Sequence, residues 1–323
     1  MIGKAILTAS IAFGLAQAAW GQPAPPPGPD MAAVFAAQNR IPDTPGSGPY
    51  PAVAEAWADA TGYTLYRPRT LPDRSLPLVL WGNGGCRDNG PSASHFLREI
   101  ASHGYVVIAN GAPREEEPAL EALPRPAPAS VTPPAPRAPD ETSVDQLLAA
   151  IDWAEGVNAA AGPLAGKIDI GRIAVMGHSC GGLQALVAGT DARIDTVVAF
   201  ASGVYNRPNS GLSGVQIAKE DLARLHTPVA YILGGPEDIA FPNGTDDFER
   251  IGHVPVMLAN LPVGHGGTFR IVNGGDWARV GTTWLDWQLK GDPQAARWFV
   301  GPECRLCTTY GWTVQRKQFP ETP

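Results

Sequence analysis

The chain has 323 residues, of which 44% are hydrophobic, so it can bury a sizeable core within a single α/β domain. Its formal net charge of -7 and the absence of a dense Lys/Arg cluster exclude nucleic acid as an expected partner, because phosphate binding needs concentrated positive charge. In chain order, Lys4 precedes an apolar run from Ala5 to Ala19, and the run ends in the candidate cleavage site Ala19-Trp20-Gly21. This layout predicts a signal peptide over residues 1–21 and a secreted or periplasmic protein. The run is shorter than the ~20 residues of a membrane span, so no stable membrane anchor is expected.

Residues 22–51 are rich in Pro, Gly and Ala and lack apolar periodicity, which predicts an N-terminal arm. In the domain predicted over residues 52–291, short apolar runs alternate with helical patterns, which is typical of βαβ units and a mostly parallel sheet. The expected strands are Tyr63–Tyr66, Pro77–Trp81, Tyr105–Ala109, Arg172–Met176, Thr196–Phe200, Val229–Leu233 and Val254–Leu261. The expected helices are Ala93–His103, Ser143–Trp153, Cys180–Ala188 and Gly275–Leu289.

One long connection, residues 113–139, interrupts this alternation. It contains many prolines, the acidic run 115–117 and almost no apolar periodicity. Connections of this kind are either functional loops or disordered segments. A functional loop at this point would overhang the carboxyl ends of the strands.

The strongest chemical motif is Gly177-His178-Ser179-Cys180-Gly181, a G-x-S-x-G pattern between an expected strand and an expected helix. A serine hydroxyl becomes a useful nucleophile only when a sharp turn presents it beside a base. The two glycines leave room for that turn to approach its neighbours. Ser179 is therefore the candidate nucleophile, and the alternative is a glycine-rich turn that happens to contain a serine.

At this motif the chain resembles the α/β-hydrolase family, and within it the secreted esterases grouped with dienelactone hydrolases, chlorophyllases and polyester hydrolases. The resemblance covers about Thr61 to Gly291. It rests on the Ser179 motif, on residues 78–86 (LVLWGNGGC), on residues 101–107 (ASHGYVV), and on the acid and histidine segments described next. It implies an α/β-hydrolase fold, with a mostly parallel eight-stranded sheet and helices on both faces.

Two later segments supply the expected partners of Ser179, since this fold orders them Ser, acid, His along the chain. Asp238 follows the expected strand 229–233 and matches the acid position better than its neighbour Glu237. His265 lies on a glycine-bounded loop after the next strand and is the expected general base. We expect His178, inside the motif, to pack beside the site and not to titrate in it.

An oxyanion formed during acyl transfer needs preorganised N–H donors. The first expected donor is the N–H of Cys180, directly after the nucleophile. The second is the N–H of Gly85, in the loop after strand 77–81, with Cys86 as the next choice. The alternative for this loop is a flexible turn with no anion role.

The candidates for an apolar pocket are the aromatic residues Trp81, Tyr205 and Phe241. The alternative for each is packing in the core.

The four cysteines form an even set, which an oxidising compartment can pair. Cys304 and Cys307 lie in a C-terminal extension, residues 292–323, and their spacing predicts a local disulfide. The fold would bring the backbones of Cys86 and Cys180 near each other, but two buried thiols are favoured over a bond, because a disulfide needs facing side chains.

The sequence contains no set of residues with metal-ligand spacing and no dinucleotide-binding fingerprint, so no cofactor is expected.

Together these features predict hydrolysis of a small-molecule or polymeric carboxylic ester through an acyl-enzyme on Ser179. Lactone or polyester hydrolysis is the alternative within the fold. A catalytically silent binding protein on the same scaffold is the alternative from another class, because fold does not determine function. The complete order of Ser179, Asp238 and His265 favours the enzyme.

Overall fold

The computed structural model describes residues 43–113, 140–207 and 213–319. The predicted signal peptide, most of the predicted arm and nearly all of the Pro-rich connection lie outside these residues.

The centre of the molecule is a nine-stranded sheet with the order β1-β2-β4-β3-β5-β6-β7-β8-β9. The strands are β1 (Ala52–Glu55), β2 (Tyr63–Pro68), β3 (Leu76–Gly82), β4 (Val106–Asn110), β5 (Ile168–His178), β6 (Thr196–Phe200), β7 (Val229–Leu233), β8 (Val256–Asn260) and β9 (Thr313–Lys317). From β4 to β8 the neighbouring strands pair in parallel, whereas β1, β2 and β9 pair antiparallel at the two edges. The expected α/β class with a mostly parallel sheet is confirmed. The expected count of eight strands is wrong, because β9 adds a strand beyond β8.

Strands β3, β4, β6 and β7 are buried along their whole length, as their continuous apolar sequences require in a sheet covered on both faces. Alternate residues face two separate apolar clusters: Val79 and Trp81 belong to one, and Leu78 and Leu80 belong to the other. This period of two sends successive side chains from Leu78 to Trp81 alternately into the two cores.

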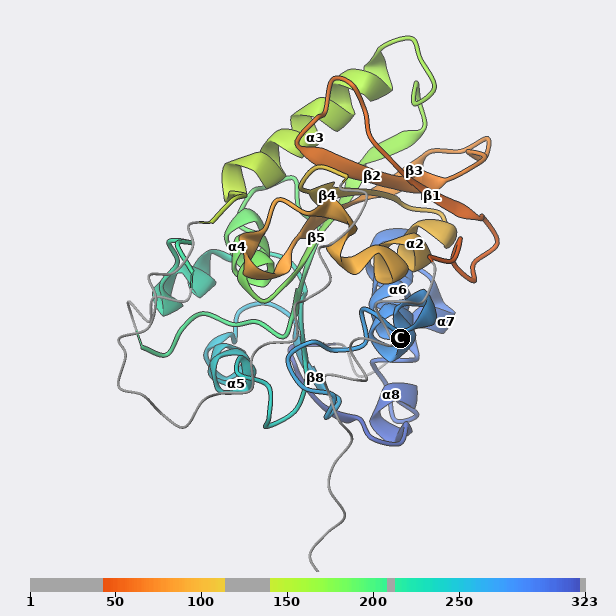
Figure 1. Cartoon of the computed structure of the whole chain (residues 1–323). Helices are drawn as coiled ribbons and strands as arrows, with labels where there is room; N and C mark the ends of the chain where they lie inside the picture. The colour runs from red at the N-terminus through yellow and green to blue at the C-terminus, as the bar shows by residue number, and fades with distance from the viewer. Residues whose placement is uncertain (1–42, 114–139, 208–212, 320–323) are drawn as a thin grey trace, which may run out of the picture.

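Helices cover both faces of the sheet (Figure 1). The α2 and α6 side chains join the Trp81 cluster, and those of α3, α4 and α5 join the Leu80 cluster. The helical elements are η1 (Gly84–Cys86), η2 (Gly90–Ala93), α2 (Ser94–Ser102), α3 (Val144–Ala159), α4 (Cys180–Ala188), η3 (Lys219–Arg224), α5 (Phe241–Arg250), η4 (Val272–Gly274), α6 (Gly275–Lys290), α7 (Pro293–Ala296) and α8 (Arg305–Thr308). No helix in the described part of the chain combines the length and the apolar character needed to cross a membrane.

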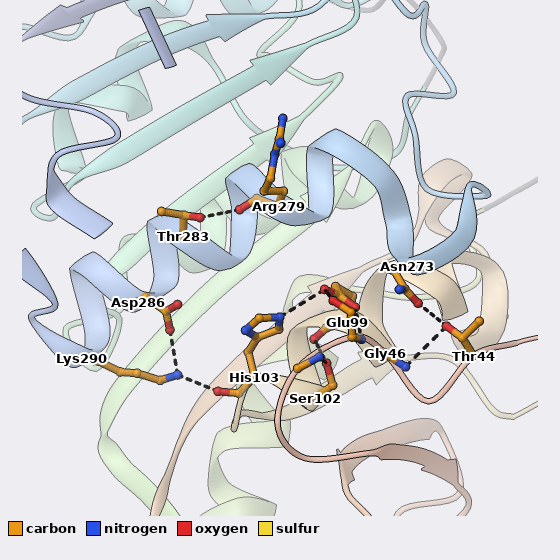
Figure 2. A network of polar contacts seen from close by, with 12 residues as sticks. Thr44, Gly46, Glu99, Ser102, His103, Asn273, Arg279, Thr283, Asp286 and Lys290 are labelled. Atoms are coloured by element: carbon orange, nitrogen blue, oxygen red, sulfur yellow. Dashed lines mark hydrogen bonds and ion pairs between the residues drawn. The ribbon is translucent and has the colours of Figure 1, made fainter. Parts of the chain in front are cut away.

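Residues 43–51, the last part of the predicted arm, pack beside α2 and η4. Ser47 donates its backbone N–H and its hydroxyl to the two carboxylate oxygens of Glu99, at 2.7 and 2.6 Å. His103 Nε2 lies 3.1 Å from the same carboxylate, and Thr44 is hydrogen-bonded to Asn273 (Figure 2). Residues 43–51 of the predicted arm are therefore attached to the domain. Hydrogen bonds hold this segment, and a search for apolar periodicity does not detect them.

The predicted C-terminal extension belongs to the same domain. β9 pairs with the whole of β8, from Thr313 opposite Asn260 to Lys317 opposite Val256. Buried side chains from the same region join the Trp81 cluster; they include Phe299, Leu306 and Trp312. The predicted Cys304–Cys307 disulfide is confirmed, with its Cα atoms 5.2 Å apart.

Candidate active site

Ser179 occupies a one-residue turn between β5, which ends at His178, and α4, which begins at Cys180. Its φ of 53° and ψ of -117° lie outside the regions that residues with a side chain normally adopt, so the surroundings must hold this backbone in place. The Ser179 N–H donates to Phe200 O at 3.0 Å, and Ser202 Oγ donates to Ser179 O at 2.7 Å. The turn is thus anchored to the end of β6. The positive φ at a serine marks a constrained feature and not a flexible glycine-rich turn.

Gly181 allows this turn to sit directly against the end of β3. A Cβ atom added to Gly181 would overlap the backbone of Gly82. No larger residue fits, which explains the second glycine of the motif in steric terms.

A continuous line of hydrogen bonds joins the three residues expected to act together. Ser179 Oγ lies 2.9 Å from His265 Nε2, and His265 Nδ1 lies 2.6 Å from Asp238 Oδ1. Each side chain comes from the carboxyl end of a parallel strand: Ser179 follows β5, Asp238 follows β7 and His265 follows β8. Parallel strands align these ends along one edge of the sheet. The sheet therefore brings Ser179 near Asp238, 59 residues later in the chain, and Asp238 near His265, 27 residues later still.

Asp238 is well prepared to remain ionised. Its side chain is fully buried, whereas Glu237 is exposed, so the two adjacent carboxylates have different surroundings. Burial alone would raise the pKa of Asp238. The hydrogen bonds from His265, from Ala240 N–H at 2.9 Å and from Gly234 N–H at 3.0 Å outweigh burial and hold the pKa below its ordinary value.

His178 packs under His265, as expected. Its Nε2 lies 2.8 Å from the backbone oxygen of His265 and donates to it, and its ring centroid lies 5.0 Å from that of Phe269. Burial, together with the nearby His265, lowers the pKa of His178 to about 4. His178 is therefore a neutral hydrogen-bond donor that supports the loop carrying His265.

Asn83 holds the loop that carries the expected second oxyanion donor. Its Oδ1 accepts from Trp81 Nε1 and Ser92 Oγ, each at 3.0 Å. Its Nδ2 donates to Arg87 O at 3.1 Å and to the backbone oxygen of Asn110. Asn83 is completely buried, so its side chain has exchanged water for these four partners. From the sequence, this loop was placed at the oxyanion site, but no role was assigned to the Asn83 side chain, whose amide can both donate and accept.

Gly85 is better placed than Cys86 to bind an anion. The N–H of Cys86 donates to Asn83 O at 3.1 Å and is therefore already engaged. Gly85 has a φ of 64° and lines the same cavity as Ser179. The N–H groups in the first turn of a helix have no intrahelical acceptor, and Cys180, which begins α4, lines the same cavity.

Cys86 and Cys180 form a disulfide, with their Cα atoms 5.3 Å apart. The expectation of two buried thiols is therefore wrong. The close approach of Gly181 to Gly82 brings the η1 turn and the start of α4 together, and this separation suits a disulfide. Asp140 lies beside both sulfurs, but disulfide sulfurs carry no thiolate charge, so this group does not fit a metal ion.

The cavity beside Ser179 has a volume of about 140 Å³. Apolar and small side chains form most of its wall; they include Leu183, Ala201, Tyr205, Ile239 and Ala240. Trp81 is buried in the core against Phe96, and Phe241 packs against the Leu80 cluster, so of the three aromatic candidates Tyr205 is the one that lines the cavity.

No family model and no curated protein sequence matches this chain. His265 is within hydrogen-bond reach of the Ser179 proton, and Asp238 can orient and stabilise an imidazolium.

Proposed function

We propose that this protein hydrolyses carboxylic esters on an α/β-hydrolase fold, with Ser179 as the nucleophile. The observation that carries the proposal is the unbroken hydrogen-bonded line from Ser179 through His265 to the buried Asp238. The chain order Ser, acid, His at the carboxyl ends of β5, β7 and β8 supports it further.

The reaction has two halves. Ser179 Oγ attacks the ester carbonyl carbon while His265 Nε2 takes the hydroxyl proton, and Asp238 stabilises the resulting imidazolium. The N–H groups of Gly85 and Cys180 hold the tetrahedral oxyanion. Collapse of this intermediate expels the alcohol, which receives the proton from His265. Water activated by His265 then attacks the acyl-enzyme, and a second collapse releases the carboxylic acid and restores the Ser179 hydroxyl.

The site favours a short acyl group. Its cavity of about 140 Å³ is smaller than the roughly 300–1,000 Å³ of pockets that enclose drug-sized ligands. The apolar wall formed by Leu183 and Ala201 suits a hydrocarbon chain and offers it no charge.

The two disulfides suit an oxidising compartment. They support a secreted or periplasmic location after removal of residues 1–21, as the predicted signal peptide implies.

A fluorophosphonate probe tests the proposal directly. We expect covalent labelling of the wild-type protein at Ser179, located by peptide mass mapping, and no labelling of Ser179→Ala. Turnover of p-nitrophenyl esters of increasing acyl length should be fastest for short chains, and parallel assays with lactones and polyester films separate those substrates. A folded wild-type protein that is neither labelled nor active on any of these esters would instead identify a binding protein on this scaffold.

A further inference from the structure

The Cys86–Cys180 disulfide joins the two segments that carry the proposed oxyanion donors. Cys180 supplies one donor through its own N–H, and Gly85, which supplies the other, is the residue before Cys86. We propose that this disulfide is a positioning element that sets the distance between the two N–H groups. The inference rests on the proposed esterase function.

Both joined segments have unusual backbone conformations. Gly85 and Cys86 have φ values of 64° and 50°, and Ser179, next to Cys180, has a φ of 53°. Residues with a side chain persist in this left-handed region only where the surrounding structure enforces it. The disulfide supplies such a constraint on both segments, because it joins Cys86 in one to Cys180 in the other.

Hydrogen bonds hold each segment to its neighbours, and one indirect path joins the two sides, because Thr142, which donates to Cys86 O, accepts from Gln184 Nε2 of α4. Asn83 holds the η1 side, and Cys86 O accepts the N–H groups of Glu141 and Thr142 at 2.9 and 3.0 Å. On the other side, Phe200 and Ser202 hold Ser179. The disulfide is the direct covalent link between the two segments, and it holds the Cα atoms of Cys86 and Cys180 5.3 Å apart.

This distance matters because an oxyanion hole works only when its donors lie within about 2.7–3.1 Å of the developing charge. Cys86 and Cys180 are almost completely buried, with exposed fractions of 0% and 4%, so this disulfide lies inside the packed structure. A cross-link between residues 94 positions apart also stabilises the fold by restricting the unfolded chain. The test must therefore separate positioning from stability.

The principal variant is Cys86→Ser/Cys180→Ser, which keeps the backbone N–H of residue 180. Its matched control is Cys304→Ser/Cys307→Ser, which removes the disulfide that lies away from the cavity. Both are assayed on a short p-nitrophenyl ester well below their measured Tm. We expect the principal variant to lose about 100-fold in kcat, comparable to the loss of one oxyanion donor, with KM within a few-fold of wild type. The control should keep the wild-type kcat.

A trifluoromethyl ketone gives a readout that a purely structural role would not change. Its hemiketal with Ser179 carries an oxyanion, so its inhibition constant should rise in parallel with the fall in kcat/KM. Binding of the carboxylic acid product, which forms no such adduct, should change by no more than a few-fold. A kcat within about threefold of wild type, or a loss of kcat without a matching loss of ketone affinity, would overturn the inference.

If the principal variant does not fold, the folded control protein replaces it, because Cys86–Cys180 is then the remaining disulfide among the four cysteines of the chain. A water-soluble phosphine reduces it to two thiols and becomes the phosphine oxide, with water supplying the oxygen atom and the protons. We expect kcat to fall on reduction and to return on reoxidation. Unchanged kcat after thiol titration has confirmed full reduction would refute the positioning role. An inactive, unlabelled wild-type protein would instead reject the esterase function and this inference with it.

Discussion

Asp238 Oδ1 lies 2.6 Å from His265 Nδ1, at the buried end of the hydrogen-bonded chain that starts at Ser179. The Asp238 carboxylate is fully enclosed, and the neighbouring Glu237 faces solvent. The two adjacent acids therefore have separate roles, which single substitutions can resolve.

We expect Asp238→Asn to lower kcat by about 1,000- to 10,000-fold, because an amide cannot stabilise the imidazolium and favours the wrong tautomer of His265. Glu237→Gln is the matched control and should stay within a few-fold of wild type. Steady-state kinetics on both variants decide the matter, and the opposite ranking would assign the acid to Glu237.

Ser179→Ala and His265→Ala should each leave less than about one part in a thousand of the wild-type kcat. Both side chains lie at a partly open cavity, so far-UV circular dichroism and Tm should change little. His253→Ala, which alters a histidine bonded to Leu225 O, is the control and should keep full kcat. Residual turnover above this level in Ser179→Ala would remove Ser179 as the nucleophile.

His178 should make the protein less stable in mild acid. The unfolded chain binds a proton at His178 below its ordinary pKa of 6.5, whereas the folded protein binds it only near pH 4. The free energy of unfolding therefore falls as pH drops through that window, and the loss from this group reaches about 2 kcal/mol at about pH 5. Below pH 4 both states carry the proton, and this contribution becomes constant.

Urea unfolding at about pH 7 and about pH 5 measures this effect. His178→Gln can still donate to His265 O and does not titrate, so it should lose about 2 kcal/mol less than wild type over the interval. His226→Gln alters an exposed histidine and should retain the wild-type pH dependence. Identical slopes for wild type and His178→Gln would contradict the prediction.

Ile239 should determine how well apolar esters bind. It lines the cavity and is 66% exposed, so it offers apolar surface to a substrate. Replacing this exposed side chain should change the stability of the fold little. Ile239→Asn should raise KM for the preferred ester about 5- to 10-fold, which corresponds to about 1 kcal/mol of lost apolar contact, with kcat nearly unchanged. Ile170→Asn alters another exposed isoleucine, at 40%, outside this cavity and should leave KM unchanged. An equal KM for both variants would exclude Ile239 from substrate binding.

The elements that sequence reasoning predicted well are those with an unambiguous apolar pattern. Strands β6 and β7 and helix α4 begin and end at the predicted residues. β9 was missed because an edge strand with the sequence TVQRK has few apolar residues to bury. α5 was missed because Pro242 and Gly244 suggest a break, although proline is tolerated in the first turn of a helix.

The same distinction applies to the site. Ser179, Asp238 and His265 were predicted from local motifs, and the structure brings Ser179 and Asp238 within hydrogen-bond distance of His265. The bond between Cys86 and Cys180 was not predicted, because it depends on a close approach between two backbones that no local pattern reports. The four bonds of the Asn83 side chain likewise involve partners that only the folded chain assembles.

The two edge strands of the sheet, β1 and β9, differ in length and in side chains. β9 lies along all five residues of β8 and occupies backbone groups that would otherwise attract a strand from another molecule. Four of the five β9 residues are polar, namely Thr313, Gln315, Arg316 and Lys317, so this edge strand offers few apolar side chains to a second sheet. At the far side, β1 is only four residues long and bears the ion pair between Glu55 and Arg67. Within residues 43–113, 140–207 and 213–319, neither edge of the sheet is a long apolar strand, which disfavours edge-to-edge aggregation of the folded domain.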